Sequence, residues 1–157
     1  MREHTCCFTG HRKMTQEQRK IVAERLYRTV EGLICSGVRY FGAGGALGFD
    51  TMAAECVLTL RERYPHIKLI LVLPCVSQTK GWLKEDVRTY EKIKCRADKT
   101  VYTSQEYTKD CMFKRNRHLV DHSSICVAYL KESKGGTAYT VKYAMQKGLQ
   151  VINLADP

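Results

Sequence analysis

The chain has 157 residues, of which 44% are hydrophobic and 27% charged, a composition that suits one globular domain and argues against intrinsic disorder. Its net charge of +10 and its isoelectric point near 9.3 favour an anionic partner: nucleic acid, a nucleotide or phosphate. The longest uninterrupted apolar run, residues 69–76, is far shorter than the roughly 20 residues that a membrane-spanning helix needs. No membrane partner is therefore expected.

Strand-like and helix-like segments alternate along the whole chain, without a linker, a repeat or a low-complexity tract. Strands are predicted at residues 4–9, 38–43, 67–73, 99–102, 125–130 and 151–154, and helices at residues 15–35, 50–63, 82–94, 108–122 and 136–147. Thr15 and Gln18 have the spacing of a capping box at the start of the first helix. Strict alternation predicts an α/β fold: a doubly wound, mostly parallel, Rossmann-like sheet of about six strands with helices on both faces, in a single domain over residues 1–157.

The cysteine pattern indicates buried thiols and no metal centre. Apart from the adjacent Cys6 and Cys7, every gap between the eight cysteines is at least fifteen residues, so no ligand spacing of the CxxC kind exists. The amino terminus is too polar for a secretory signal, which favours a reducing, cytoplasmic location and free thiols. Cys6, Cys7 and Cys126 lie in apolar runs, where sulfur packs well; a reactive thiol is the alternative.

The first predicted strand-to-helix loop carries residues that suit a phosphate. In doubly wound sheets ligands collect outside the carboxyl ends of the strands, beside the point where strand order reverses. The segment Thr9, Gly10, His11 and Arg12 offers a hydroxyl, an imidazole and a guanidinium around a glycine that permits a close turn. The alternative is a surface turn with an incidental basic pair.

The second loop, residues 42–50, contains four glycines and leads into a helix, where backbone N–H groups and the helix dipole hold anions. Its spacing is neither the dinucleotide fingerprint nor a P-loop. We predict that Gly44, Gly45 and Gly48 admit a phosphate to the helix amino terminus, and that Asp50 caps the helix or accepts a ribose hydroxyl. The alternative is that Gly48 and Asp50 only start the helix.

The third loop, residues 134–137, again joins a strand to a helix, so the same argument applies to its N–H groups. In the preceding helix, Arg115 and Asn116 share the face of an apolar stripe, where an isolated charge is costly without a partner. These two side chains are therefore predicted to line a ligand pocket. In the alternative, Asn116 holds a loop backbone and Arg115 pairs with Asp50 or Asp121.

Taken in order, four motifs resemble the SLOG superfamily, and most of all its YpsA-like branch of bacterial proteins. These motifs are residues 8–12, residues 44–50, the pair Arg115 and Asn116, and residues 135–137. The resemblance covers most of the chain. It implies a Rossmann-like fold that binds nucleotides or nucleotide-derived ligands.

Two relatives within that superfamily supply rival functions. The cytokinin-activating phosphoribohydrolases are similar at Gly44–Gly45, Met112-x-x-Arg115 and Gly136–Thr137, but the glutamate of their PGGxGTxxE signature is missing here. N-glycosidic hydrolysis needs a carboxylate near the sugar, so the enzyme interpretation is weakened unless Asp50, Glu55 or Asp121 substitutes.

The DNA-processing protein DprA supplies the other rival. It is similar at Phe113-x-Arg115-Asn-Arg117, which together with the net charge makes single-stranded DNA an alternative ligand. The extra domains that accompany the DprA core have no counterpart in this sequence.

The leading hypothesis is therefore a small cytoplasmic protein that binds a nucleotide or nucleotide-derived phosphate ligand as a sensor. No cofactor and no metal are predicted, and catalysis is not implied. Weak binding of single-stranded nucleic acid and a homodimer both remain open. The predicted ligand-binding residues are Thr9, Gly10, His11, Arg12, Gly44, Gly45, Gly48, Asp50, Arg115, Asn116, Arg117, Gly135, Gly136 and Thr137.

Overall fold

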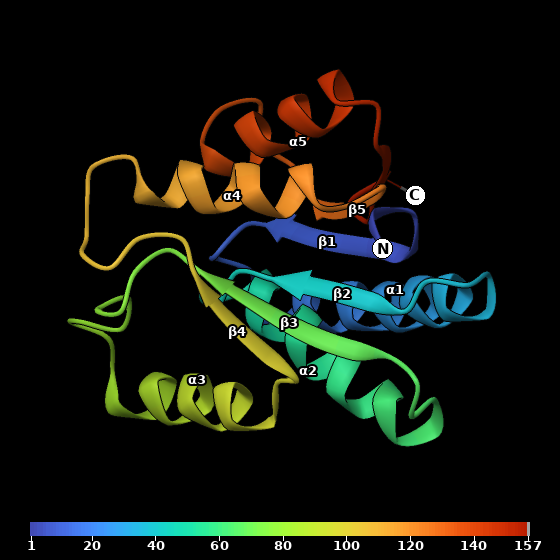
Figure 1. Ribbon diagram of the computed structural model, residues 1–157, viewed down its shortest axis with the longest axis horizontal. Helices are drawn as coiled ribbons and strands as arrows, with labels where there is room; N and C mark the ends of the chain where they lie inside the picture. Colours follow the sequence, from blue (N-terminus) through green and yellow to red (C-terminus); the bar gives the residue numbers. More distant parts are fainter. Residues whose placement is uncertain (157) are drawn as a thin grey trace.

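The computed structural model describes residues 1–156, in which strands and helices alternate as predicted (Figure 1). After a 3-10 turn at Arg2–His4, the elements are β1 (Thr5–Gly10), α1 (Gln16–Cys35), β2 (Tyr40–Ala43), α2 (Phe49–Arg63), β3 (Lys68–Leu73), α3 (Lys84–Arg96), β4 (Lys99–Tyr102), α4 (Cys111–Asp121), β5 (Ile125–Tyr129), α5 (Gly136–Gln146) and β6 (Gln150–Asn153). The predicted boundaries differ from these by a few residues at most.

All six strands form one parallel sheet in the order β4-β3-β2-β1-β5-β6. The chain builds outward from β1 to β4 and then returns to the other side of β1, so strand order reverses between β1 and β5. Because crossovers of this kind are right-handed, the reversal moves the helices to the opposite face of the sheet. Figure 1 shows α4 and α5 together on one side and α1, α2 and α3 on the other. The predicted doubly wound, Rossmann-like α/β fold is confirmed.

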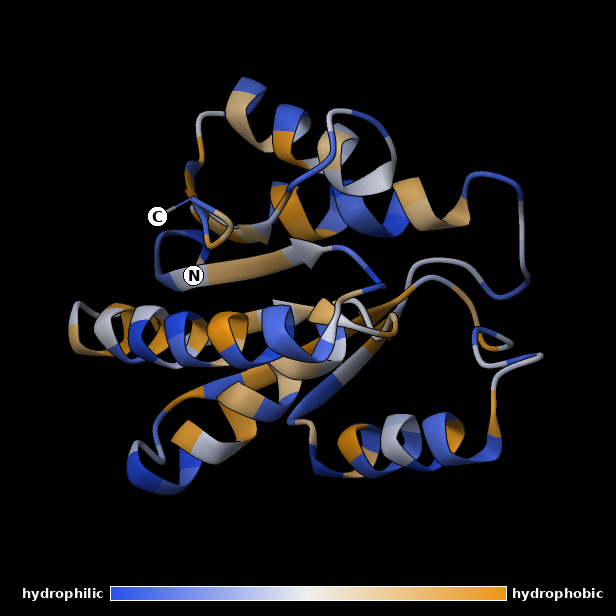
Figure 2. Cartoon of the chain, turned by 180° about the vertical axis from the view of Figure 1, so that it is seen from behind, coloured by the Kyte–Doolittle hydropathy of each residue, from blue (hydrophilic) through white to orange (hydrophobic). Residues whose placement is uncertain are grey.

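Both faces of the sheet are buried. Successive side chains of β1 point alternately to the two faces, and each face has its own apolar cluster. Cys6 and Phe8 belong to the larger apolar cluster, which includes α1 and α2, whereas Cys7 belongs to the cluster beneath α4 and α5. In Figure 2 the helices carry both apolar and hydrophilic residues, as expected for elements with one covered face. All eight cysteines are free, and Cys6, Cys7 and Cys126 are fully buried as predicted.

The capping box at the start of α1 forms as predicted. The Thr15 hydroxyl accepts from the Gln18 N–H at 3.1 Å, and the Gln18 side-chain oxygen accepts from the Thr15 N–H at 2.9 Å. Two of the N–H groups near the amino terminus of this helix are thereby satisfied locally. Among the helices that the structure describes, none is long and apolar enough to cross a membrane.

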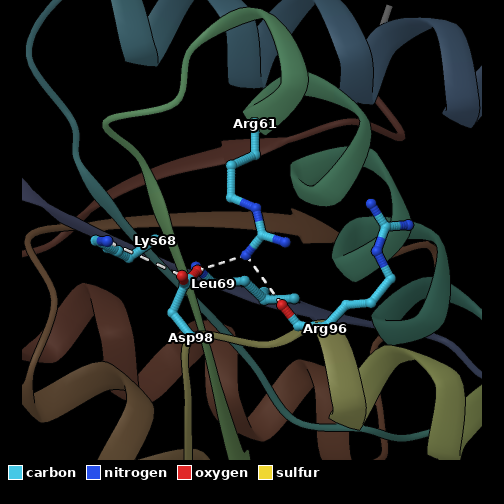
Figure 3. A network of polar contacts seen from close by, with 5 residues as sticks. All are labelled: Arg61, Lys68, Leu69, Arg96 and Asp98. Carbon is cyan, nitrogen blue, oxygen red and sulfur yellow. Dashed lines mark hydrogen bonds and ion pairs between the residues drawn. The ribbon is translucent and has the colours of Figure 1, made fainter.

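A polar network ties the elements together at the amino end of β4 (Figure 3). Asp98 accepts from the Arg61 guanidinium and from the Leu69 N–H, both at 2.8 Å, and Arg61 also donates to the Arg96 carbonyl at 3.0 Å. Lys68 lies 4.0 Å from the same carboxylate. This network joins the ends of α2 and α3 to the starts of β3 and β4. The opposite, carboxyl edge of the sheet carries the predicted loops.

Candidate functional site

A cavity of about 490 Å³ opens at the carboxyl edge of the sheet, within the roughly 300–1,000 Å³ range of small-molecule sites. It lies beside β1, next to the point where strand order reverses, which is where ligands of doubly wound sheets bind. Nine of the fourteen predicted residues line it: Thr9, Gly10, His11, Arg12, Asp50, Arg115, Asn116, Gly136 and Thr137. Folding thus brings three separate loops and one face of α4 to a common space.

Arg115 places a buried positive charge at this cavity. Its side chain is only 4% exposed, its Nη1 donates to the Gly44 carbonyl, and its Nε donates to Asn116 Oδ1 at 2.7 Å. Burial lowers the pKa of the guanidinium, and the nearby Asp50 carboxylate opposes that effect. No carboxylate forms an ion pair with Arg115 anywhere in residues 1–156, so the predicted alternative of pairing with Asp50 or Asp121 is not what the structure shows.

Asp50 is the carboxylate of the cavity. It is 7% exposed and accepts from the Ala46 N–H at 3.3 Å. Helix α2 begins at Phe49 with Gly48 as its N-cap, so the prediction that Asp50 caps the helix is wrong. Burial raises the pKa of Asp50, while Arg115, the Ala46 N–H and Arg12 pull it down.

The glycine loop before α2 is packed against the rest of the protein. A Cβ atom on Gly44 would lie 2.6 Å from the Arg115 guanidinium carbon, and one on Gly48 would lie 2.6 Å from the Arg12 carbonyl carbon. Gly48 also has a φ of +79°, which L side chains rarely adopt. The first N–H group of α2, on Phe49, donates to the His11 carbonyl at 3.1 Å. Gly44, Gly45 and Gly48 do not line the cavity, and the protein's own backbone occupies the first N–H group of this helix.

The amino terminus of α5 differs in that even its first N–H group is available, whereas in α2 the first N–H group is occupied and only those of Asp50 and Thr51 lack an acceptor within residues 1–156. Its N-cap residue, Gly135, makes no side-chain cap and does not itself line the cavity. The N–H groups of Gly136 and Thr137 have no acceptor within residues 1–156, and both residues line the cavity. The helix dipole and these two donors favour an anion at this end of the cavity.

The loop after β1 supplies three further polar groups. The Thr9 side chain is 6% exposed, and its hydroxyl makes no hydrogen bond within residues 1–156. His11 Nε2 accepts from the Lys131 N–H at 2.9 Å, so this nitrogen carries no proton and the ring donates through Nδ1. That His11 contacts a phosphate stays a prediction, with Nδ1 as the ring nitrogen left for a ligand, and the exposed Arg12 adds a positive charge to this loop.

Sequence reasoning missed the part of the lining that comes from the loops after β3 and β4. Gln78 is buried; its amide nitrogen donates to the Gly44 carbonyl at 3.2 Å, and its amide oxygen accepts from the Tyr90 hydroxyl at 3.1 Å. Trp82 and Tyr107 add aromatic surface, joined by Met112 and Ala46. Their position after strand ends was the available signal, but these loops have no glycine-rich motif.

Arg117 lies outside the cavity, on the outer surface of α4 and α5. Its guanidinium donates to the Tyr139 hydroxyl at 3.3 Å, and the Tyr139 ring contacts Phe113 with centroids 4.8 Å apart. Tyr143 stacks beyond Tyr139, with 6.5 Å between centroids. We call these four residues the α4/α5 aromatic surface. It provides the exposed aromatic and basic groups that a single-stranded nucleic acid would need.

The fold and the cavity together define a Rossmann-like α/β protein with a polar, cationic pocket at its switch point. The profile of the YpsA, or YspA SLOG, family matches residues 6–153, and the chain belongs to this family. It is 33% identical over 134 residues to the uncharacterized SPbeta prophage-derived protein YoqJ of Bacillus subtilis strain 168, covering 77% of this chain and 78% of that protein. It is 29% identical over 130 residues to a UPF0398 protein of Bacillus thuringiensis strain Al Hakam, covering 81% and 71% of the two chains.

Solved structures of DprA share the fold. The Streptococcus pneumoniae protein superimposes with a TM-score of 0.67 at 17% identity, over 95% of this chain and 49% of that chain. The Helicobacter pylori protein, studied for its single-stranded DNA binding mode, also gives 0.67 at 18% identity, over 94% of this chain and 63% of that chain. The chain therefore spans about half of the first protein and somewhat less than two-thirds of the second.

Proposed function

We propose that this protein binds a nucleotide or a nucleotide-derived phosphate ligand in the cavity at the carboxyl edge of the sheet. The observation that carries the proposal is Arg115, a buried guanidinium that lines the cavity without an ion pair in residues 1–156. A buried charge is costly unless it is compensated. The Asp50 carboxylate attracts Arg115 without forming an ion pair with it, and Arg12 adds a second positive charge, so an anionic ligand would complete the balance of charge in the cavity. Membership of the YspA SLOG family is consistent with this assignment.

The other lining groups divide by chemistry into donors for phosphate and surfaces for a base. Arg12, the Thr9 hydroxyl and the N–H groups of Gly136 and Thr137 donate to phosphate oxygens. Trp82 and Tyr107 offer rings on which a base stacks. The amide groups of Asn116 and Gln78 are held by contacts to Arg115 and Tyr90 and read the sugar or the base.

Ligand-dependent stabilisation tests this proposal. Unfolding of the purified protein is followed with AMP, GMP, CMP and UMP, for the wild type, Arg12→Ala and Arg28→Ala. Arg28 is an exposed arginine paired with Glu24 on α1 that does not line the cavity, and it serves as the charge-matched control. A nucleotide present at 100 times its dissociation constant should add roughly 2.7 kcal/mol to wild type and Arg28→Ala, and clearly less to Arg12→Ala. Equal responses of both variants would contradict the assigned site.

The same mixtures test the phosphoribohydrolase alternative. Of the three candidate carboxylates only Asp50 lines the cavity, since Glu55 lines separate surface hollows and Asp121 accepts from the Tyr143 hydroxyl at 2.7 Å. Chromatography of the mixtures should show no free base. Base release that disappears in Asp50→Asn would replace the binding function with N-glycosidic hydrolysis.

Single-stranded nucleic acid is the second candidate, favoured by the α4/α5 aromatic surface beside the cavity. Phe113 and Tyr139 are exposed there next to Arg117, as a stacking platform requires. DprA, whose fold is similar, is described as a single-stranded DNA-binding protein. We propose that such binding in this chain is weak and salt-sensitive, because only a few basic groups flank the rings.

A further inference from the structure

A second cavity, of about 420 Å³, adjoins the proposed site. It lies between the loop that follows β1 and the loop that follows β5, and it shares two lining residues with the first cavity, His11 and Arg12. The imidazole of His11 is fixed at this boundary by the Lys131 N–H, at 2.9 Å from Nε2. One extended ligand can therefore contact both cavities while Arg12 lies at their junction.

The charge of the second cavity favours an anion. Arg12, Lys13 and Lys131 line it, and Glu132 is the only carboxylate among its lining residues. Three cations against one anion leave a positive excess in a partly enclosed space, where charge–charge attraction is less screened than on a flat surface.

Tyr129 supplies a polar group that the protein itself does not use. Its side chain is 3% exposed and lines the second cavity, with its ring stacked on Phe49 at 6.2 Å and edge-on to His11 at 5.7 Å between centroids. Its hydroxyl makes no hydrogen bond within residues 1–156 and is not enclosed by the protein, so it is free to contact a ligand in the cavity. Burial raises the pKa of Tyr129, so the hydroxyl keeps its proton and can donate to a phosphate oxygen.

We propose that the second cavity holds a second phosphoryl group of the same ligand. The preferred ligands are then nucleotides with a phosphate chain of two or more phosphoryl groups. The first group would lie at Thr9 and the α5 amino terminus, and the next at Tyr129, Lys13 and Lys131, with Arg12 contacting both. This inference rests on the proposed function of the first cavity and adds the class of nucleotide that it selects.

The test compares AMP with ADP and GMP with GDP by isothermal titration, in the absence of divalent cations. Wild type should bind the diphosphate at least about tenfold more tightly than the matching monophosphate, as expected for a hydrogen bond to a charged group plus two lysines. Tyr129→Phe removes only the hydroxyl and keeps the ring packing on Phe49, so it should reduce that ratio severalfold without unfolding the protein. The double variant Lys13→Ala/Lys131→Ala should bring the ratio close to one.

Two matched variants sharpen the result. Lys20→Ala/Lys142→Ala removes the same charge from exposed positions on α1 and α5 that line neither cavity, and should preserve the wild-type ratio. Glu132→Gln removes the one carboxylate and should raise the ratio. If AMP and ADP bind equally and the variants leave the ratio unchanged, the second phosphate site is refuted while the proposed function stands. If no nucleotide binds, the proposed function and the second phosphate site are both refuted.

Discussion

Two glycine-containing loops lead into helices at the same edge of the sheet, yet they differ in how tightly the rest of the protein packs against their glycines. The loop at residues 42–48 is closed: Gly44 packs against Arg115, Gly48 packs against the Arg12 backbone, and the first N–H group of α2 donates to His11. The loop at Gly135 is open, since a Cβ on Gly135 or Gly136 would meet no atom within 4 Å. A glycine-rich loop before a helix therefore does not by itself make an anion site.

The largest expected difference between the two loops is in stability. Gly48→Ala forces a left-handed backbone and a clash with main-chain atoms of Arg12, and should cost at least about 3 kcal/mol in the free energy of unfolding. Gly136→Ala meets open space and should change that free energy by less than about 1 kcal/mol. Urea unfolding of both variants measures this, and similar losses would remove the distinction between a closed and an open loop.

The next effect is on ligand binding in the cavity, where Arg115 of α4 packs against the closed loop. Arg115→Ala removes the buried guanidinium and should abolish nucleotide-dependent stabilisation, a loss of roughly 2.7 kcal/mol at 100 times the dissociation constant. Arg117→Ala, on the same helix but outside the cavity, should retain it. Circular dichroism verifies that both variants are folded. Full nucleotide stabilisation of Arg115→Ala would show that the ligand lies elsewhere.

A smaller effect concerns Asp50, the carboxylate in the first turn of α2 after the closed loop. Its pKa is raised in the folded protein, so its contribution to stability is complete below the ordinary value near 3.8 and is lost as pH rises through the folded value. The asparagine of the Asp50→Asn variant cannot ionise, so the variant does not lose stability in this way as the pH rises. The unfolding free energy of the variant relative to wild type should therefore increase as the pH rises above about 4. A constant difference over that range would show that burial does not control this carboxyl group.

The smallest effect is expected on the outer surface beside the open loop. Binding of a fluorescent oligothymidylate should be weak, should fall steeply with added salt, and should decrease less than about tenfold in Arg117→Ala. Arg28→Ala is again the control. Tight binding at physiological salt that Arg117→Ala abolishes, without competition by mononucleotides, would make nucleic acid the principal ligand.

Much of the fold and part of the site could be predicted because they depend on local pattern. Alternating apolar strands and amphipathic helices permit few arrangements, and parallel strands bring every loop after a strand to one edge. The placement of Thr9, Arg12, Arg115 and Thr137 around one cavity follows from that rule. The cavity is also lined by Gln78, Trp82 and Tyr107, which likewise follow strands, but no sequence motif distinguishes these residues from other loop residues.

What the sequence by itself determined is the order of elements, the sheet they form and the edge at which polar loops gather. Only the tertiary structure decided how tightly each glycine loop is packed, that α2 begins at Phe49 with Gly48 and not Asp50 as its N-cap, and that Tyr129 lines a second cavity. The reason is physical. Whether a backbone N–H or a side-chain hydroxyl is available depends on what packs against it, and those neighbours come from segments distant in the chain.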